Sequence, residues 1–220
     1  MRGHVSGEVV LADLHKDAKL HASLNVDELK IARSTYDSGS FVLDARDGKL
    51  GARATLHQTD GYVDLQATTG IQWGSALVPV PDPAASTDAR LTANNFQAGA
   101  ILPFARGVLN SLDGRIDANV AVKTGPAFAT PVMDGKIVFH DGTLQLTALG
   151  DELKDARASV AFQPGGIIKI DDVYMRAVDG EVTGDAQIKT KGLGFDSATA
   201  SLHIPANKPI DLSMQGQAFG

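Results

Sequence analysis

The chain has 220 residues, no cysteine and a formal net charge of −6. Without cysteine it has no disulfide and no thiolate metal site, and its scattered basic residues argue against nucleic acid or a polybasic contact with anionic lipid. Aromatic residues make up only 5% of the chain and glycine occurs 23 times, which is typical of a protein with many turns.

An Asp-Gly pair followed by a polar and then an apolar residue recurs along the chain. Asp-Gly favours a type I′ hairpin turn, because Asp tolerates a positive φ and Gly adopts it freely. We therefore predict a tight turn at each copy, with a strand after it. The six copies begin at Asp47, Asp60, Asp113, Asp134, Asp141 and Asp179.

Residues 1–73 are predicted to form a first β-sheet segment, because apolar residues alternate with polar ones. The alternating stretches lie near residues 9–14, 20–26, 41–45, 50–56 and 63–67. Residues 74–90 are interpreted as a proline-rich connector. Its alternate prolines at 79, 81 and 83 cannot donate to a β-ladder.

Residues 91–112 are predicted to hold a short strand at Leu91 and Ala93, and then a short amphipathic helix. Apolar residues recur there at intervals of three and four, and Pro103 suits the first turn of a helix. The helix is expected to run from about Pro103 to Asn110 and to pack on the apolar face of the sheet as a lid or spacer.

Residues 113–220 form the last predicted segment, in which strand patterns return. Alternation is clear from Ile116 to Val122 and again near residues 137–146, 158–162, 168–170, 182–188 and 200–204. A connecting turn is expected at Leu149–Asp155. Because no long helix interrupts these strands, we predict an all-β fold: an elongated, mainly antiparallel, curled sheet with one short amphipathic helix.

The sequence offers no pattern of catalytic or metal-binding residues. The histidines, at positions 4, 15, 21, 57, 140 and 203, lack ligand spacing and are interpreted as solvent-facing residues of strands or turns. The acidic pairs Asp151-Glu152 and Asp171-Asp172 do not match a calcium loop and are assigned to turns. A nucleophile elbow and a phosphate-binding glycine loop are also lacking. We expect a protein that is not an enzyme and has no cofactor or metal.

The order of motifs over residues 112–184 resembles the AsmA-like proteins, and specifically the TamB group (translocation and assembly module). The matching series is Leu112-Asp113-Gly114-Arg115-Ile116, Gly125 to Pro131, Asp134-Gly135-Lys136-Ile137, Asp141-Gly142-Thr143-Leu144, Leu153-Lys154-Asp155-Ala156 and Gly180-Glu181-Val182-Thr183-Gly184. Across residues 1–95 the likeness is limited to the rhythm of strands and turns. The family's N-terminal anchor and terminal segment have no counterpart here, so we expect an interior piece of a longer protein.

The resemblance implies a function as well as a fold. It implies the periplasmic part of an inner-membrane-anchored envelope protein of a Gram-negative bacterium, whose sheet folds lengthwise into a trough, the β-taco. Such a hydrophobic groove is expected to conduct phospholipids between the inner and outer membranes, to support outer-membrane protein assembly and secretion, or both. The partners implied are acyl chains or nascent outer-membrane β-strands, with an outer-membrane assembly partner that binds through other regions.

The predicted groove lining is the apolar set of the alternating strands. These residues are Ile116, Val120, Val122, Phe139, Leu144, Leu146, Val160, Phe162, Ile168, Ile170, Val182 and Ile188. The alternating pattern alone leaves another interpretation open: a structural or adhesive β-solenoid or sandwich segment with a dry core and no ligand. Small residues on the same face, such as Ala118 and Ala158, favour an open trough, although they also permit close sheet packing.

Overall fold

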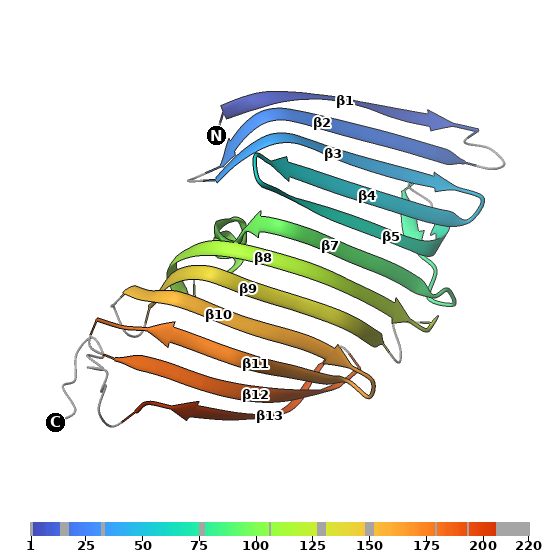
Figure 1. The fold of residues 1–220 in the computed structure, drawn as a ribbon. Coiled ribbons are helices and arrows are strands. Elements are labelled where there is room, and N and C mark those ends of the chain that lie inside the picture. The colour runs from blue at the N-terminus through green and yellow to red at the C-terminus, as the bar shows by residue number, and fades with distance from the viewer. Residues whose placement is uncertain are drawn as a thin grey trace.

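The computed structural model describes residues 2–13, 18–31, 34–74, 78–105, 107–126, 131–147, 152–178, 180–192 and 194–205. Nearly all of them belong to one β-sheet (Figure 1). The strands are β1 (Arg2–Ala12), β2 (Lys19–Ile31), β3 (Ser34–Arg46), β4 (Lys49–Gln58), β5 (Gly61–Trp73), β6 (Pro79–Pro81), β7 (Thr87–Gln97), β8 (Leu109–Thr124), β9 (Val132–Leu146), β10 (Glu152–Gln163), β11 (Ile167–Arg176), β12 (Glu181–Lys191) and β13 (Gly194–His203). A 3₁₀ turn, η1 (Ala98–Ile101), and one helical turn, α1 (Leu102–Ala105), connect β7 to β8.

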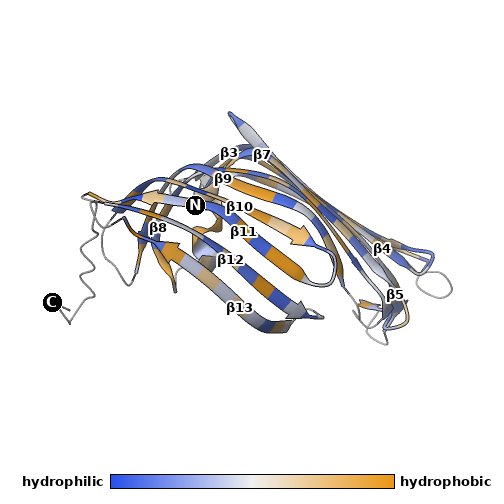
Figure 2. Ribbon diagram, turned by 60° about the horizontal axis from the view of Figure 1, so that its bottom comes forward, coloured by the Kyte–Doolittle hydropathy of each residue, from blue (hydrophilic) through white to orange (hydrophobic). Residues whose placement is uncertain are grey.

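The strands follow one another across the sheet in chain order. Each pairs antiparallel with the next from β1 to β5 and from β7 to β13; β5 pairs with β7, and the short β6 pairs with the end of β5. Figure 2 shows that the sheet is curled and stays open. The predicted fold class, an elongated, antiparallel, curled all-β sheet, is therefore confirmed.

The pairing register separates apolar from polar side chains. Cα partners in an antiparallel ladder project to the same face, so a row of partners marks one face of the whole sheet. We call the apolar face the one with the row Val5, Val26, Gly39, Leu56, Val63, Ala93, Ala118, Ile137, Val160, Ile170, Ala186, Ala200. The polar face has the row Ser6, Asn25, Ser40, Thr55, Asp64, Thr92, Asn119, Lys136, Ala161, Lys169, Gln187, Thr199.

A line of β-bulges crosses the sheet from β7 to β11. Its members have a positive φ and lie where the register shifts. We call them the bulge line: Asn95 in β7, Gly114 in β8, Asp141 in β9, Asp155 in β10 and Asp172 in β11. A bulge inserts an extra residue, bends its strand and increases the local twist. In β7, β9, β10 and β11 the ladders contain one extra residue, and Gly114 of β8 lies opposite the extra residue of β9. Bulges on these four strands therefore bend the sheet along a common line.

The structure shows tight turns at only some of the Asp-Gly pairs. The pair at Asp47 is the expected two-residue turn, with φ of 51° and 69° at Asp47 and Gly48. At Asp60 the turn lies one residue earlier, because Gln58 already pairs with Gly61. The pair that begins at residue 179 falls between β11 and β12, as expected for a hairpin, although Asp179 itself lies outside the described residues.

The other three Asp-Gly pairs lie inside strands, so the turn prediction is wrong for them. Asp141-Gly142 contains the bulge of β9, and Gly114 of Asp113-Gly114 lies opposite it in β8. In Asp134-Gly135 the glycine has a φ of 122° and faces β8 so closely that a Cβ would collide with the Asn119 carbonyl. A positive φ serves a bulge or a close backbone contact as well as a turn, which is why the dipeptide alone misleads.

Residues 74–112 contain more β-strand than predicted. Residues 87–90 of the expected connector belong to β7, which is an 11-residue strand, and β6 pairs Pro79 with Trp73. The expected helix from Pro103 to Asn110 is wrong in extent, since the helical residues are 98–105 and Leu109 pairs with Leu146. The ladder with β9 thus begins at Leu109, and the backbone there pairs with that strand instead of continuing a helix.

Two further turn assignments also change. Of the turn expected at Leu149–Asp155, residues 152–155 form the start of β10, and the rest lies outside the described residues. The acidic pair Asp171-Asp172 lies within β11, where Asp172 forms a bulge. Glu152 of the other pair is also a strand residue.

Candidate apolar binding face

All twelve predicted lining residues project from the apolar face. Their Cα partners connect them directly: Val120 faces Leu91, Val160 faces Ile137 and Ile170, and Ile168 faces Phe162 and Ile188. The remaining members are reached along the same ladders: Ile116, Val122, Phe139, Leu144, Leu146 and Val182.

The bulge line keeps these residues on one face. Phe139 and Leu144 are five positions apart in β9, so strict alternation would place them on opposite faces. Because Asp141 is an extra residue in the strand, Leu144 projects from the same face as Phe139. Leu144 pairs there with Leu112 and Leu153. Asp172 does the same in β11, where Val173 follows Ile170 on the apolar face.

Much of the apolar face is uncovered by the residues that the structure describes. Val9 is 68% exposed, Leu202 69% and Phe195 72%, and each projects from this face. No large side chain among the described residues is fully buried. These three residues lie on the edge strands β1 and β13, whereas the predicted lining residues between them are half-buried, and Val120 is buried. Large exposed apolar patches mark interaction sites in most soluble proteins.

One end of the apolar face is closed by a cluster of packed side chains next to the bulge line. Its buried members are Leu29, Tyr36, Ala93, Phe96 and Ala118, and Val26, Leu56, Val63, Leu91, Ala100, Ile116 and Ile137 pack against them. The rings of Tyr36 and Phe96 lie 6.3 Å apart although β4 and β5 separate their strands. Contact across two intervening strands requires the sheet to curve toward this face, so the apolar face is concave here.

The η1 and α1 turns pack at this closed end. Both contact β8; Ala98 is fully buried, and Ala100 packs against the cluster. The predicted spacer on the apolar face therefore exists, but it is two short turns instead of one helix. The cluster was not predicted from the sequence, because all predicted lining residues lie between positions 116 and 188. The strands before residue 74 show the same alternation of apolar and polar residues.

The opposite end of the strands is bordered by threonines on the apolar face. Thr69, Thr87 and Thr124 form a row of Cα partners, and the hydroxyls of Thr69 and Thr87 share a hydrogen bond of 2.9 Å. Thr124 Oγ1 is buried without a hydrogen-bond partner among the described residues. From Ile116 to Thr124 the strand rises by roughly 26 Å, which sets the width of the apolar strip on β8.

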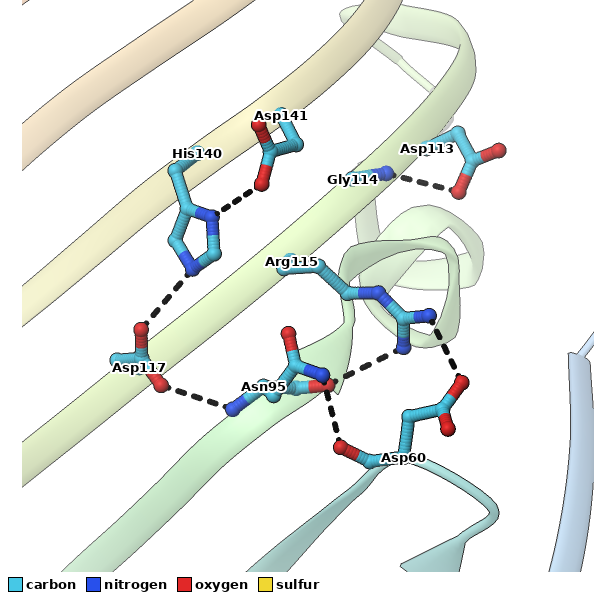
Figure 3. A network of polar contacts seen from close by, with 8 residues as sticks. All are labelled: Asp60, Asn95, Asp113, Gly114, Arg115, Asp117, His140 and Asp141. Carbon is cyan, nitrogen blue, oxygen red and sulfur yellow. Dashed lines mark hydrogen bonds and ion pairs between the residues drawn. The ribbon is translucent and has the colours of Figure 1, made fainter.

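The polar face carries a network of hydrogen bonds and ion pairs at the bulge line (Figure 3). The backbone N–H of Asn95 donates to Asp117 Oδ1 at 2.8 Å, and the Arg115 guanidinium donates to the backbone carbonyl of Asn95 at 3.2 Å. The Arg115 guanidinium also lies 3.5 Å from Asp60 Oδ2. His140 contacts the carboxylates of Asp117 and Asp141. The network joins the β4–β5 turn to β7, β8 and β9 on the polar face, at the bend of the sheet.

The described histidines all lie in strands and project from the polar face, in agreement with the solvent-facing interpretation. They are His4, His21, His57, His140 and His203, whereas His15 lies outside the described residues. Within the described ranges, no three His, Cys, Asp or Glu side chains are arranged to hold a metal ion. The polar face also borders a cavity of about 920 Å³ near Arg46, Lys49 and Asp82.

No family model, curated protein or solved structure matches this chain. Among the described residues, no helix has the length and hydrophobicity to span a membrane.

Proposed function

We propose that this chain is a non-enzymatic segment of a TamB-like envelope protein whose apolar face conducts phospholipid acyl chains between the inner and outer membranes, supports outer-membrane protein assembly and secretion, or both. The observation that favours this role is the apolar face of the single-layered sheet, which the described residues leave partly uncovered. In such a protein, this segment would lie in the periplasm.

The geometry of the apolar face suits a path that runs across the strands. The twelve strands of the continuous path, spaced by about 4.8 Å, make a row roughly 50 Å long. An acyl chain spans about half of the ~30 Å hydrocarbon core of a bilayer, so it would cover roughly three to four strands. The face therefore offers several successive positions to one chain.

The energetics favour movement over capture. Burial contributes roughly 0.8 kcal/mol per methylene, so a long acyl chain gains on the order of 10 kcal/mol relative to water. Relative to a bilayer the gain is close to zero, because both environments are apolar. A continuous apolar strip would thus lower the barrier to transfer without trapping the lipid at one position, and no polar recognition site is required.

A charge on the apolar face should weaken guest binding while the sheet survives. We propose Val160→Asp, whose neighbours Ile137 and Ile170 are apolar, with the matched control Ala161→Asp on the polar face. Titration with a fluorescent fatty acid should show at least about ten-fold weaker binding for V160D, or ~1.4 kcal/mol, and near-native binding for A161D. Circular dichroism would verify the sheet. Equal binding by both variants, or none by the unmodified chain, would contradict the proposal.

A further inference from the structure

His140 lies between two carboxylates on the polar face of β9 (Figure 3). Its Nδ1 is 2.7 Å from Asp141 Oδ2, and its Nε2 is 2.9 Å from Asp117 Oδ2. The imidazole side chain is about one-third exposed. The ring therefore bridges β8 and β9 at the point where both strands bend.

This geometry specifies the protonation state of the ring. A neutral imidazole has one N–H donor and one lone pair, whereas ionised carboxylates only accept hydrogen bonds. Both nitrogens lie at hydrogen-bond distance from a carboxylate oxygen. If the ring were neutral, one nitrogen lone pair would face an anionic oxygen. The arrangement is satisfied when His140 is the imidazolium and donates to both carboxylates.

The contacts of Asp117 extend this bridge to the neighbouring strand. While Asp117 Oδ2 accepts from His140, Oδ1 accepts the backbone N–H of Asn95, the bulge residue of β7. Asp141, the second partner of the ring, is itself the bulge residue of β9, with a φ of 50°. Two bulges of the bulge line are thus tied to one imidazolium.

We propose that His140 is a proton-dependent staple that holds β7, β8 and β9 together across the bulge line and so couples pH to the bend of the sheet. When the ring loses its proton, one of its two hydrogen bonds is lost and the carboxylates of Asp117 and Asp141 remain without the positive charge between them. The bend then loosens. This inference concerns the stability of the sheet and is independent of whether the apolar face binds a lipid or a protein.

The other charged groups near His140 have partners of their own. From β8, Arg115 contacts Asp60 and the Asn95 carbonyl, and Asp113 accepts from the Gly114 amide. From β10, Arg157 lies 4.3 Å from the centre of the Tyr174 ring, and Asp155 pairs with Arg176. Asp117 and Asp141 are the carboxylates in contact with the ring.

The electrostatics agree in direction with this geometry. The hydrogen bond to Asp141 raises the pKa of His140 above its ordinary value; partial burial opposes the rise, and Asp117 adds to it. A raised folded-state pKa means that the folded protein binds the proton more tightly than the unfolded chain. The stabilisation is therefore complete below the unfolded pKa of about 6.5 and is lost as the pH rises through the folded pKa.

A titration of the histidine imidazoles by nuclear magnetic resonance tests the staple in the full chain. Between about pH 5 and pH 9, His140 should keep both ring protons to a higher pH than an ordinary imidazole, whose pKa is about 6.5. The His140 signal is assigned by its loss in His140→Gln. In Asp117→Asn the His140 pKa should fall. A His140 ring that titrates at or below the ordinary imidazole pKa of about 6.5, or that is a single neutral tautomer near pH 6, overturns the proposal.

A pH profile of stability separates the staple from a merely structural histidine. The urea midpoint of unfolding should be lower for His140→Gln than for the unmodified chain at acidic pH, and the difference should shrink as the pH rises through the folded pKa of His140. If the H140Q offset stays constant or grows with pH, the proposal fails. If H140Q does not fold, the titration of the unmodified chain and of D117N still decides.

Discussion

Thr87 and Thr124 are Cα partners on the apolar face, but their hydroxyls have different surroundings. Thr87 Oγ1 is hydrogen-bonded to Thr69, and the buried Thr124 Oγ1 has no partner among the described residues. A buried polar group without a partner costs stability, and its replacement by an apolar group of the same shape removes that cost.

Thr124→Val should therefore stabilise the protein, and Thr87→Val should destabilise it. We expect the free energy of unfolding to rise by about 1 kcal/mol in T124V and to fall by about 1 kcal/mol in T87V. Urea unfolding followed by circular dichroism measures both. If T124V were the less stable of the two, Thr124 would have a hydrogen-bond partner after all.

Single residues show how far sequence reasoning reaches. The alternation from Ile116 to Val122 was enough to place those side chains on one face, since period two is a direct consequence of strand geometry. The carboxylate partners of His140 could not be predicted from the sequence. Asp117 is 23 positions away in sequence, and it meets the ring because the register of β8 and β9 places Arg115 opposite His140 and Asp117 two positions further along the same face.

The bulges illustrate a different limit at the scale of the strand. Asp-Gly at 113 and 141 signals a positive φ correctly, but a positive φ does not distinguish a turn from a bulge. The ladder partners decide, and they belong to other strands. The helix between β7 and β8 was overestimated for the same reason, because the pairing of Leu109 with Leu146 outweighs the local pattern.

Asp172 allows the bulge of β11 to be tested in isolation, because it is exposed and has a φ of 61°. Glycine adopts this conformation without steric cost, whereas a β-branched residue strains it. Asp172→Gly should raise the free energy of unfolding by up to about 1 kcal/mol, and Asp172→Val should lower it by about 1–3 kcal/mol.

The control for Asp172 is Asp185→Gly, at an exposed position of β12 without a positive φ. There glycine should cost roughly 0.5–1 kcal/mol, because it only adds unfolded-state freedom. Thermal or urea unfolding distinguishes the two. Destabilisation of the same size by both glycine variants would show that Asp172 does not occupy a strained bulge in solution.

For the whole molecule, sequence left two architectures open: a trough with an accessible apolar face, and a sandwich with a dry core. Both give the same alternation, because alternation reports one apolar face and not what covers it. The described strands form one open layer, with packed side chains at the closed end and exposed ones such as Phe41 and Leu65 further along.

An open layer explains the unusual distribution of burial. The cluster around Phe96 stabilises the bend, and the strands beyond it keep their apolar residues half exposed. A protein that used this face only for its own packing would gain by covering it, since each fully buried large apolar side chain contributes about 1.5–3 kcal/mol. The uncovered face is therefore the central feature of the proposed function.

Photo-crosslinking from the apolar face tests that feature most directly. A photoreactive phenylalanine analogue replaces Phe162, which projects from the apolar face between Gly135 and Ile168, and in the control it replaces Ala161 on the polar face. After irradiation in cells, mass spectrometry should find phospholipid adducts from position 162 and few from position 161. Adducts with outer-membrane β-barrel precursors at 162 would instead identify protein clients as the guest. If position 162 yields neither kind of adduct above the level of position 161, the apolar face does not hold a guest and the account is contradicted.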